Sequence, residues 1–173
     1  MNGPAPLHLH AGDADATVAL GQALGRLLAP QDLITLDGPL GAGKTTLVRG
    51  LAQGLGAAGD VSSPTFVLSQ EYEIDGGPNL EAFVHIDAYR LNPDELASIG
   101  WQGRGESFRQ ASVVVVEWSE RIASALPDDR LAIEIEHTDP GRTLQVTPMG
   151  GGVSRWSERA AGLRNALSPW AEG

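Results

Sequence analysis

One short segment constrains the fold of this chain more than any other. Residues 38–45 read Gly-Pro-Leu-Gly-Ala-Gly-Lys-Thr, which fits the pattern G-x-x-x-x-G-K-[ST] of a phosphate-binding loop. A shuffled chain of the same composition would match that pattern in roughly two of a thousand cases. The apolar segment Leu33–Asp37 before the motif predicts a buried strand, and Leu47, Leu51 and Leu55 predict a helix after it. Strand, glycine-rich loop and helix in this order predict an α/β fold of the P-loop NTPase type.

The residue types of the motif suit the phosphate tail of a nucleotide. Glycines allow successive backbone N–H groups to point at phosphate oxygens, and the N-terminus of the following helix adds its positive dipole end. Lys44, the single lysine of the chain, is placed to bridge the outer phosphates, and the Thr45 hydroxyl to bind the Mg²⁺ ion that accompanies the nucleotide. The predicted nucleotide-binding residues are Gly38, Pro39, Leu40, Gly41, Ala42, Gly43, Lys44, Thr45 and Thr46.

The rest of the chain predicts a mixed β-sheet flanked by helices, in a single domain. The spacing of apolar residues after Asp13 predicts a helix, and Asp13 is placed to cap its start. A second glycine pattern, G-x-G-x-x-G at 54–59, follows a predicted helix instead of a strand, so it is interpreted as a chance match. Strands at 67–74 and 81–87 are expected to form a hairpin, and a strand at 113–116 is expected to be buried on both faces. A strand at 131–135 should expose one face to solvent and pair with a strand at 144–146. A short helix is expected after Asn92. A P-loop ATPase domain is expected over 1–149, with a glycine hinge and an amphipathic helix at 150–173 as part of the same domain.

Two carboxylates are candidates to hold the metal from the side opposite the loop. Asp87 ends the strand at 81–87, Glu117 ends the strand at 113–116, and the sequence leaves open which of them is closer to the ion. Thr65, in the segment 62–66, is either a residue that senses the terminal phosphate or part of a turn started by Ser-Pro. His85 and Trp118 are expected to pack in the core.

Composition excludes several classes of function. The 173 residues carry 22 acidic and 12 basic side chains, for a net charge of −10, so we expect little or no binding of bare nucleic acid. The absence of cysteine excludes disulfides, thiolate metal sites and a cysteine nucleophile. Neither a secretory signal nor an apolar run of about 20 residues is recognised, which favours a cytoplasmic protein without membrane contact.

In their order along the chain, these motifs resemble the TsaE family. The resemblance rests on residues 38–46, on Ser-Pro-Thr-Phe at 63–66, on His-Ile-Asp-Ala-Tyr-Arg-Leu at 85–91, on Glu95-Leu96 with Gly100, and on Glu-Trp-Ser-Glu at 117–120. It implies a bacterial P-loop ATPase that acts with two partner proteins, TsaD and TsaB, in threonylcarbamoyl modification of the tRNA adenosine beside the anticodon. ATP turnover is then expected to reset the partner complex. The segment 103–109 and the tail from Gly150 depart from the family pattern.

The resemblance also implies roles for single residues. Lys44, Thr45 and Thr46 would bind phosphates, and Thr45 and Glu117 would hold magnesium. Catalytic or switching roles fall to Lys44, Thr65 and Asp87, and Arg142 matches a position near the nucleotide.

Two other functions remain compatible with the sequence. Small-molecule kinases share the loop, but they need an arginine-rich lid, and the only clustered arginines lie near Gly103. The second alternative is a non-catalytic switch, in which bound ATP drives assembly and hydrolysis is incidental.

Overall fold

Seven strands form one mixed sheet in the computed structural model, which describes residues 4–64, 68–75, 79–99, 110–151 and 154–173. The strands are β1 (Leu7–Ala11), β2 (Leu33–Asp37), β3 (Ser69–Glu73), β4 (Ala82–Asp87), β5 (Ser112–Glu117), β6 (Leu131–His137) and β7 (Arg142–Pro148), in the order β1-β7-β6-β2-β5-β4-β3. The four central strands β6, β2, β5 and β4 are parallel, whereas β7 and β1 at one edge and β3 at the other are antiparallel to their neighbours. The predicted mixed sheet is confirmed.

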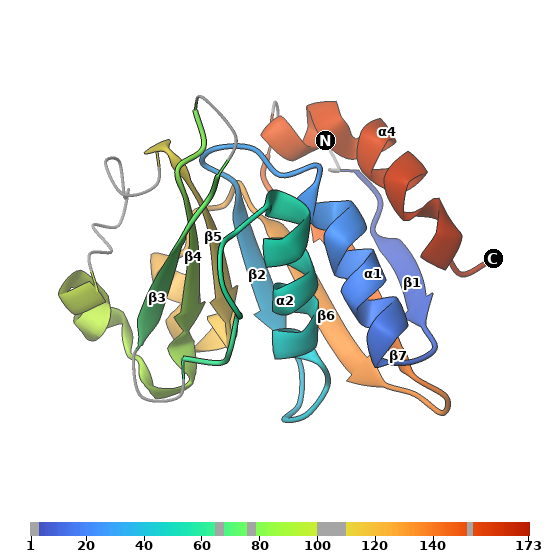
Figure 1. Ribbon diagram of the computed structural model, residues 1–173, viewed down its shortest axis with the longest axis horizontal. Coiled ribbons are helices and arrows are strands. Elements are labelled where there is room, and N and C mark those ends of the chain that lie inside the picture. Colours follow the sequence, from blue (N-terminus) through green and yellow to red (C-terminus); the bar gives the residue numbers. More distant parts are fainter. Residues whose placement is uncertain (1–3, 65–67, 76–78, 100–109, 152–153) are drawn as a thin grey trace.

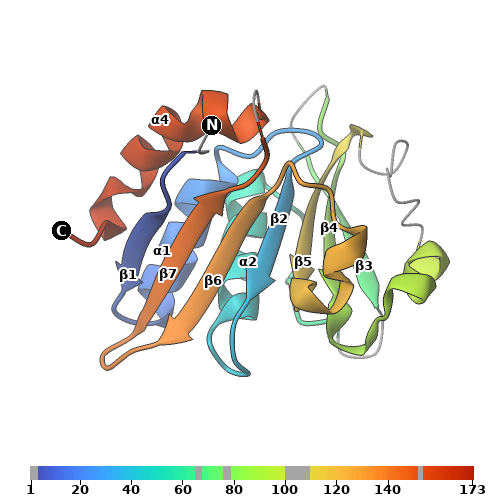
Figure 2. The same cartoon turned by 180° about the vertical axis from the view of Figure 1, so that it is seen from behind.

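Helices cover one face of this sheet, and short 3₁₀ helices cover part of the other. Figure 1 shows α1 (Ala14–Gly25) and α2 (Lys44–Leu55) in front of the sheet and α4 (Arg155–Leu167) across its upper corner. Figure 2 shows the opposite face, where η3 (Ser119–Ala125) lies over β5, whereas none of the helices that the structure describes lies in front of β6, β7 or β1. The remaining 3₁₀ helices are η1 (Ala88–Arg90), η2 (Pro93–Ile99) and η4 (Ser168–Trp170). No helix within the described residues is long and apolar enough to cross a membrane.

Strands β5 and β6 have the burial expected from their sequence patterns. All six residues of β5 are buried, as a central strand without alternation requires, and β6 alternates between buried and solvent-facing residues. The antiparallel pairing of β3 with β4 confirms the hairpin, although its turn at 76–78 lies outside the described residues. Strand β1 was not predicted. It is a five-residue edge strand that pairs with β7, far away in the sequence.

The helix starts follow from capping side chains. The Asp13 carboxylate accepts a hydrogen bond from the backbone N–H of Ala16, and the Asn92 side chain accepts from the N–H groups of Asp94 and Glu95, as predicted for the start of η2.

Glycines allow α1 and α2 to pack with their backbones in contact. Gly21 and Gly25 of α1 face Gly50 and Gly54 of α2, and a Cβ atom added at any of the four would overlap backbone atoms of the other helix. At Gly21, that atom would lie 2.6 Å from the carbonyl oxygen of Leu47. Because α2 begins at the phosphate-binding motif, this contact fixes the position of the motif against the sheet.

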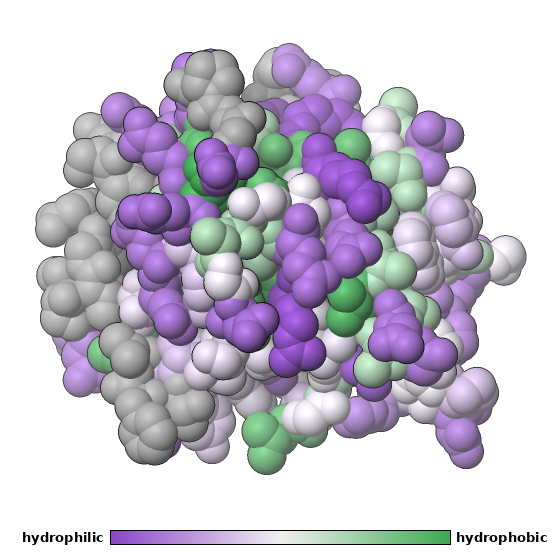
Figure 3. Space-filling model, viewed as in Figure 1, coloured by the Kyte–Doolittle hydropathy of each residue, from purple (hydrophilic) through white to green (hydrophobic). Residues whose placement is uncertain are grey.

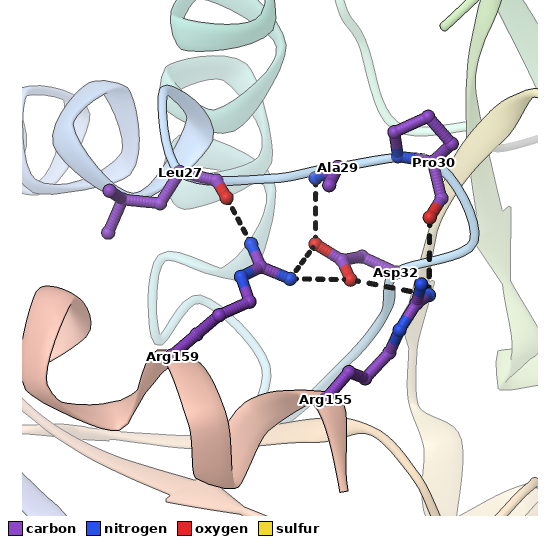
Figure 4. Close-up of polar contacts among 6 residues, drawn as sticks. All are labelled: Leu27, Ala29, Pro30, Asp32, Arg155 and Arg159. Carbon is purple, nitrogen blue, oxygen red and sulfur yellow. Dashed lines mark hydrogen bonds and ion pairs between the residues drawn. The ribbon is translucent and has the colours of Figure 1, made fainter. Parts of the chain in front are cut away.

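The C-terminal helix α4 is attached through a buried carboxylate as well as through apolar contacts. Asp32, directly before β2, is fully buried, and Nη1 of Arg159 donates to both of its oxygens at 2.8 Å (Figure 4). The backbone N–H of Ala29 also donates to this carboxylate, and Arg155 lies 3.6 Å from it. Burial raises the pKa of Asp32, and the hydrogen bond from Arg159 opposes that rise. The arginines stabilise a charge that would otherwise be costly in this position.

Candidate functional site

The segment between β2 and α2 has the backbone that its glycines predict. Gly38, Gly41 and Gly43 have φ angles of 150°, 75° and 106°, which residues with a Cβ atom rarely adopt. Gly43 is the N-cap of α2, and no side chain caps the helix there. The N-terminal N–H groups of α2 therefore face the loop without a side-chain acceptor, an arrangement that favours anion binding.

A cavity of about 460 Å³ opens beside this loop. It is lined by Ala14, Leu40, Gly41, Gly43, Lys44, Thr45, Thr46, Ser63, Asp87, Tyr89, Glu117, Trp118 and Arg142. Nine of the residues predicted from the sequence are therefore brought together. Gly38, Pro39 and Ala42 belong to the loop but do not line the cavity, and Thr65 lies outside the described residues.

Lys44 is held by its own loop and by an aromatic ring. Its ammonium group donates to the carbonyl oxygens of Gly38 at 2.6 Å and Pro39 at 3.0 Å, and lies 3.9 Å from the ring centroid of Trp118. Burial lowers the pKa of Lys44, and nearby carboxylates, Glu117 first among them, oppose that effect.

The two candidate carboxylates lie side by side but have different partners. Asp87 and Glu117 are paired in the register of the parallel strands β4 and β5, at the carboxyl ends of both. The Thr45 hydroxyl donates to Oε1 of Glu117 at 3.1 Å, whereas Asp87 accepts from Ser63 at 3.5 Å and from the backbone N–H of Tyr89. Of the two, Glu117 is the one in contact with the threonine of the loop.

Arg142 closes the cavity from the other side of the loop. It begins β7 and lies so close to Gly43 that a Cβ atom on this glycine would overlap its guanidinium group. Its Nε atom is buried and has no hydrogen-bond acceptor among the described residues. A buried N–H group without an acceptor is uncommon in folded proteins.

An acidic pair below the loop connects β2 to η3. Ser119 donates to Asp37 at 2.5 Å, and the backbone N–H of Glu120 donates to the same carboxylate at 3.3 Å. The hydrogen bond with Asp37, together with burial, raises the pKa of Glu120 to about 7. The hydrogen bonds that Asp37 accepts from Ser119 and from the Glu120 N–H hold η3 against the end of β2.

Three features of the site were missed or misjudged from the sequence. Trp118 was expected in the core, but it is partly exposed, lines the cavity and contacts Lys44, because it follows the last residue of β5 with a φ of 58°. Tyr89 packs edge-on against Trp118 at 5.0 Å between ring centroids. His85 is a fully buried neighbour, as expected, yet its Nε2 atom also lies 3.0 Å from Oε1 of Glu117. The position of Trp118, directly after Glu117 at the end of a parallel strand, was the signal that could have identified it.

This geometry defines a class of protein. A parallel central sheet, a glycine-rich loop between a strand and an uncapped helix, and carboxylates at the neighbouring strand ends are the features of a P-loop fold.

Comparison with known proteins identifies the family within that class. The family model described as "Threonylcarbamoyl adenosine biosynthesis protein TsaE" matches residues 11–144. A protein of Streptomyces coelicolor named tRNA threonylcarbamoyladenosine biosynthesis protein TsaE is 42% identical over 146 residues, which cover 80% of this chain and 92% of the relative. The Bacillus subtilis protein of the same name is 38% identical over 137 residues, covering 79% and 82%. The crystal structure of Bacillus subtilis YdiB superposes with a TM-score of 0.72 and 30% identity over 98% of both chains.

The chain therefore belongs to the TsaE family, which takes part in the biosynthesis of threonylcarbamoyladenosine in tRNA. The resemblance noted from the sequence motifs is confirmed.

Proposed function

We propose that this chain is a magnesium-dependent ATPase that acts in the cytoplasm with TsaD and TsaB in threonylcarbamoyl modification of the tRNA adenosine beside the anticodon. In this proposal ATP hydrolysis resets the partner complex and does not transfer the threonylcarbamoyl group. The observation that carries the proposal is the contact between Thr45 and Glu117 at 3.1 Å, in the same cavity that the phosphate-binding loop lines.

Nucleotide binding is supported by donors that lack anionic partners. The N-terminus of α2 has no side-chain cap, and Nε of Arg142 has no acceptor within the described part of the chain. Lys44 bonds to loop carbonyls, and exchanging these for phosphate oxygens would replace two neutral acceptors with charged ones. The charge of ATP would thus satisfy groups that the folded chain leaves without a charged partner.

The metal would be held by few side chains. Among the described residues there is no group of three or more His, Cys, Asp or Glu side chains that could hold an ion. Thr45 and Glu117 supply a hydroxyl and a carboxylate, which are oxygen donors of the kind Mg²⁺ takes when phosphates and water complete its coordination. When bound, the ion would neutralise negative charge on the phosphates.

Asp87 is proposed to orient the attacking water. Its carboxylate lines the cavity beside Glu117 and is held by Ser63 and by the N–H of Tyr89, so its position is fixed before a nucleotide arrives. Thr65 keeps its proposed role in phosphate sensing, at a position outside the described residues.

A partner surface at the mouth of the cavity is supported by exposed apolar side chains. Leu40 is 86% exposed and Tyr89 is 50% exposed, and both line the cavity. On the helix-covered side an apolar group projects at the lower edge, near the loop between β2 and α2 (Figure 3). A partner protein docked there would cover these side chains, whereas the net charge of −10 disfavours direct contact with tRNA.

The first test removes the single lysine. Lys44→Ala should abolish ATP binding, measured by calorimetry, and tRNA modification in a mixture reconstituted with TsaD and TsaB. Arg49→Ala, on the exposed side of α2, is the matched control and should change neither. Normal modification by Lys44→Ala would refute the proposal.

The second test separates the ATPase from the two alternatives. Asp87→Ala should still bind ATP but lose both phosphate release and tRNA modification. If modification continued at the normal rate while phosphate release was lost, the chain would be a non-catalytic switch. Phosphate release by the wild-type chain without an acceptor argues against a small-molecule kinase, whose predicted arginine cluster near Gly103 lies outside the described residues.

A further inference from the structure

His85 is a polar side chain in a position that packing alone would give to an apolar one. It lies in the middle of β4, fully buried, and residues of the same face on β4 and β5, Phe83, Val113 and Val115, belong to the main apolar core. Burying an imidazole is unfavourable unless its polar atoms form hydrogen bonds. Its one hydrogen bond in the described part of the chain goes to Glu117.

Glu117 accepts two side-chain hydrogen bonds on the same carboxylate oxygen. Nε2 of His85 at 3.0 Å and the hydroxyl of Thr45 at 3.1 Å both meet Oε1, and the Glu117 side chain is only 3% exposed. Since Glu117 lines the cavity, Oε2 is the oxygen available to a ligand there. Two donors from different elements, β4 and α2, thus fix the orientation of the carboxylate.

The hydrogen-bond pattern also assigns the tautomer of His85. Its Nδ1 atom is buried without a partner among the described residues, so a proton on Nδ1 would lack an acceptor. A proton on Nε2 is instead donated to the carboxylate oxygen. The ring therefore orients Glu117 through a hydrogen bond from Nε2.

We propose that His85 is a positioning residue that holds the Glu117 carboxylate ready for the magnesium ion of a bound nucleotide; this inference rests on the proposed function. His85 does not touch the ion or the nucleotide. It acts through Glu117, as hydrogen-bond partners of metal-binding carboxylates do in general, and losing such a partner lowers metal affinity by about 10- to 100-fold.

The test compares a variant that loses the donor with one that keeps it. His85→Leu removes the hydrogen bond, whereas the amide of His85→Gln retains an N–H donor at the end of the side chain. The measured quantity is the ratio of affinities for fluorescent mant-ADP with Mg²⁺ and with EDTA, because that ratio isolates the contribution of the metal. We expect His85→Leu to lower the ratio about tenfold with the EDTA affinity unchanged, and His85→Gln to retain most of it.

A core variant separates positioning from packing. Val113→Ala truncates a fully buried side chain on the same face of the strand that carries Glu117, so it loosens the core without touching the hydrogen bonds. It should lower the unfolding temperature and leave the affinity ratio unchanged. If His85→Leu kept the wild-type ratio, or if Val113→Ala lowered the ratio as much as His85→Leu, the positioning role would be refuted. A wild-type chain that bound no mant-ADP would instead refute the proposed function, and the two failures are therefore distinguishable.

Discussion

The glycine contact between α1 and α2 gives a prediction whose sign is opposite to that of helix propensity. Gly21 lies inside α1, where alanine is a better helix former by about 1 kcal/mol. Propensity alone therefore predicts that Gly21→Ala stabilises the protein. The structure predicts the reverse.

The magnitude follows from the atoms that the new methyl group would meet. It would lie 2.6 Å from the Leu47 carbonyl oxygen, 2.9 Å from Cα of Gly50 and 3.0 Å from the backbone nitrogen of Leu51, against the 3.4 Å at which ordinary contact begins. All three are backbone atoms of α2, so no side chain can rotate away, and the helices must separate by most of an ångström. Overpacking of this kind costs about 3 kcal/mol at the upper end of its usual range, which leaves a net loss of about 2 kcal/mol.

A matched glycine in another helix serves as the control. Gly162 lies inside α4 with no atom within 4 Å of an added Cβ, so Gly162→Ala should gain up to about 1 kcal/mol. Urea unfolding followed by circular dichroism measures both free energies, and Gly21→Ala should lower the melting temperature by about 6 °C. If Gly21→Ala proved as stable as the wild-type chain, the close backbone contact would not exist as described.

Two further predictions concern Asp32 and Glu120. Arg159→Met leaves Asp32 buried without its main partner and should lower the free energy of unfolding by about 3 kcal/mol. Arg155→Met removes an ion pair at 3.6 Å and a hydrogen bond to the Pro30 carbonyl from a partly exposed side chain, and should cost less, about 1 kcal/mol; equal losses in urea unfolding would contradict this. The pKa of Glu120 is raised from 4.5 to about 7 in the folded chain. Between these two pH values the folded state keeps a proton that the unfolded chain has released. The free energy of unfolding should therefore fall as the pH rises from 4.5 to about 7. Glu120→Gln should flatten that slope, and unfolding titrations at both ends of the window that showed an unchanged slope would rule out the hydrogen bond with Asp37 as its cause.

Local patterns were sufficient for most of the fold. The uninterrupted β-branched run of β5 predicted a strand buried on both faces, and the alternation in β6 predicted one wet face, since burial is imposed directly on each residue. Strand β1 escaped prediction because it is short and lies at an edge, where its pairing with β7 depends on a strand more than a hundred residues away.

The candidate site also has a part that local sequence predicts and a part that it does not. The backbone of the phosphate-binding loop follows from glycine positions, and its position before α2 follows from the adjacent sequence. The sequence does not show which carboxylate contacts Thr45, because Asp87 and Glu117 end neighbouring strands with equivalent patterns. Only the packing of α2 against the sheet brings Thr45 to Glu117.

The sequence by itself therefore determined that this chain has a P-loop sequence motif in an α/β fold, because glycine conformation and strand burial are local properties. The tertiary structure decided that Glu117 pairs with Thr45, that Arg142 lies against Gly43 and that His85 meets Glu117. Each of these contacts joins residues from separate elements, and their distances depend on strand order, register and the close packing of helices.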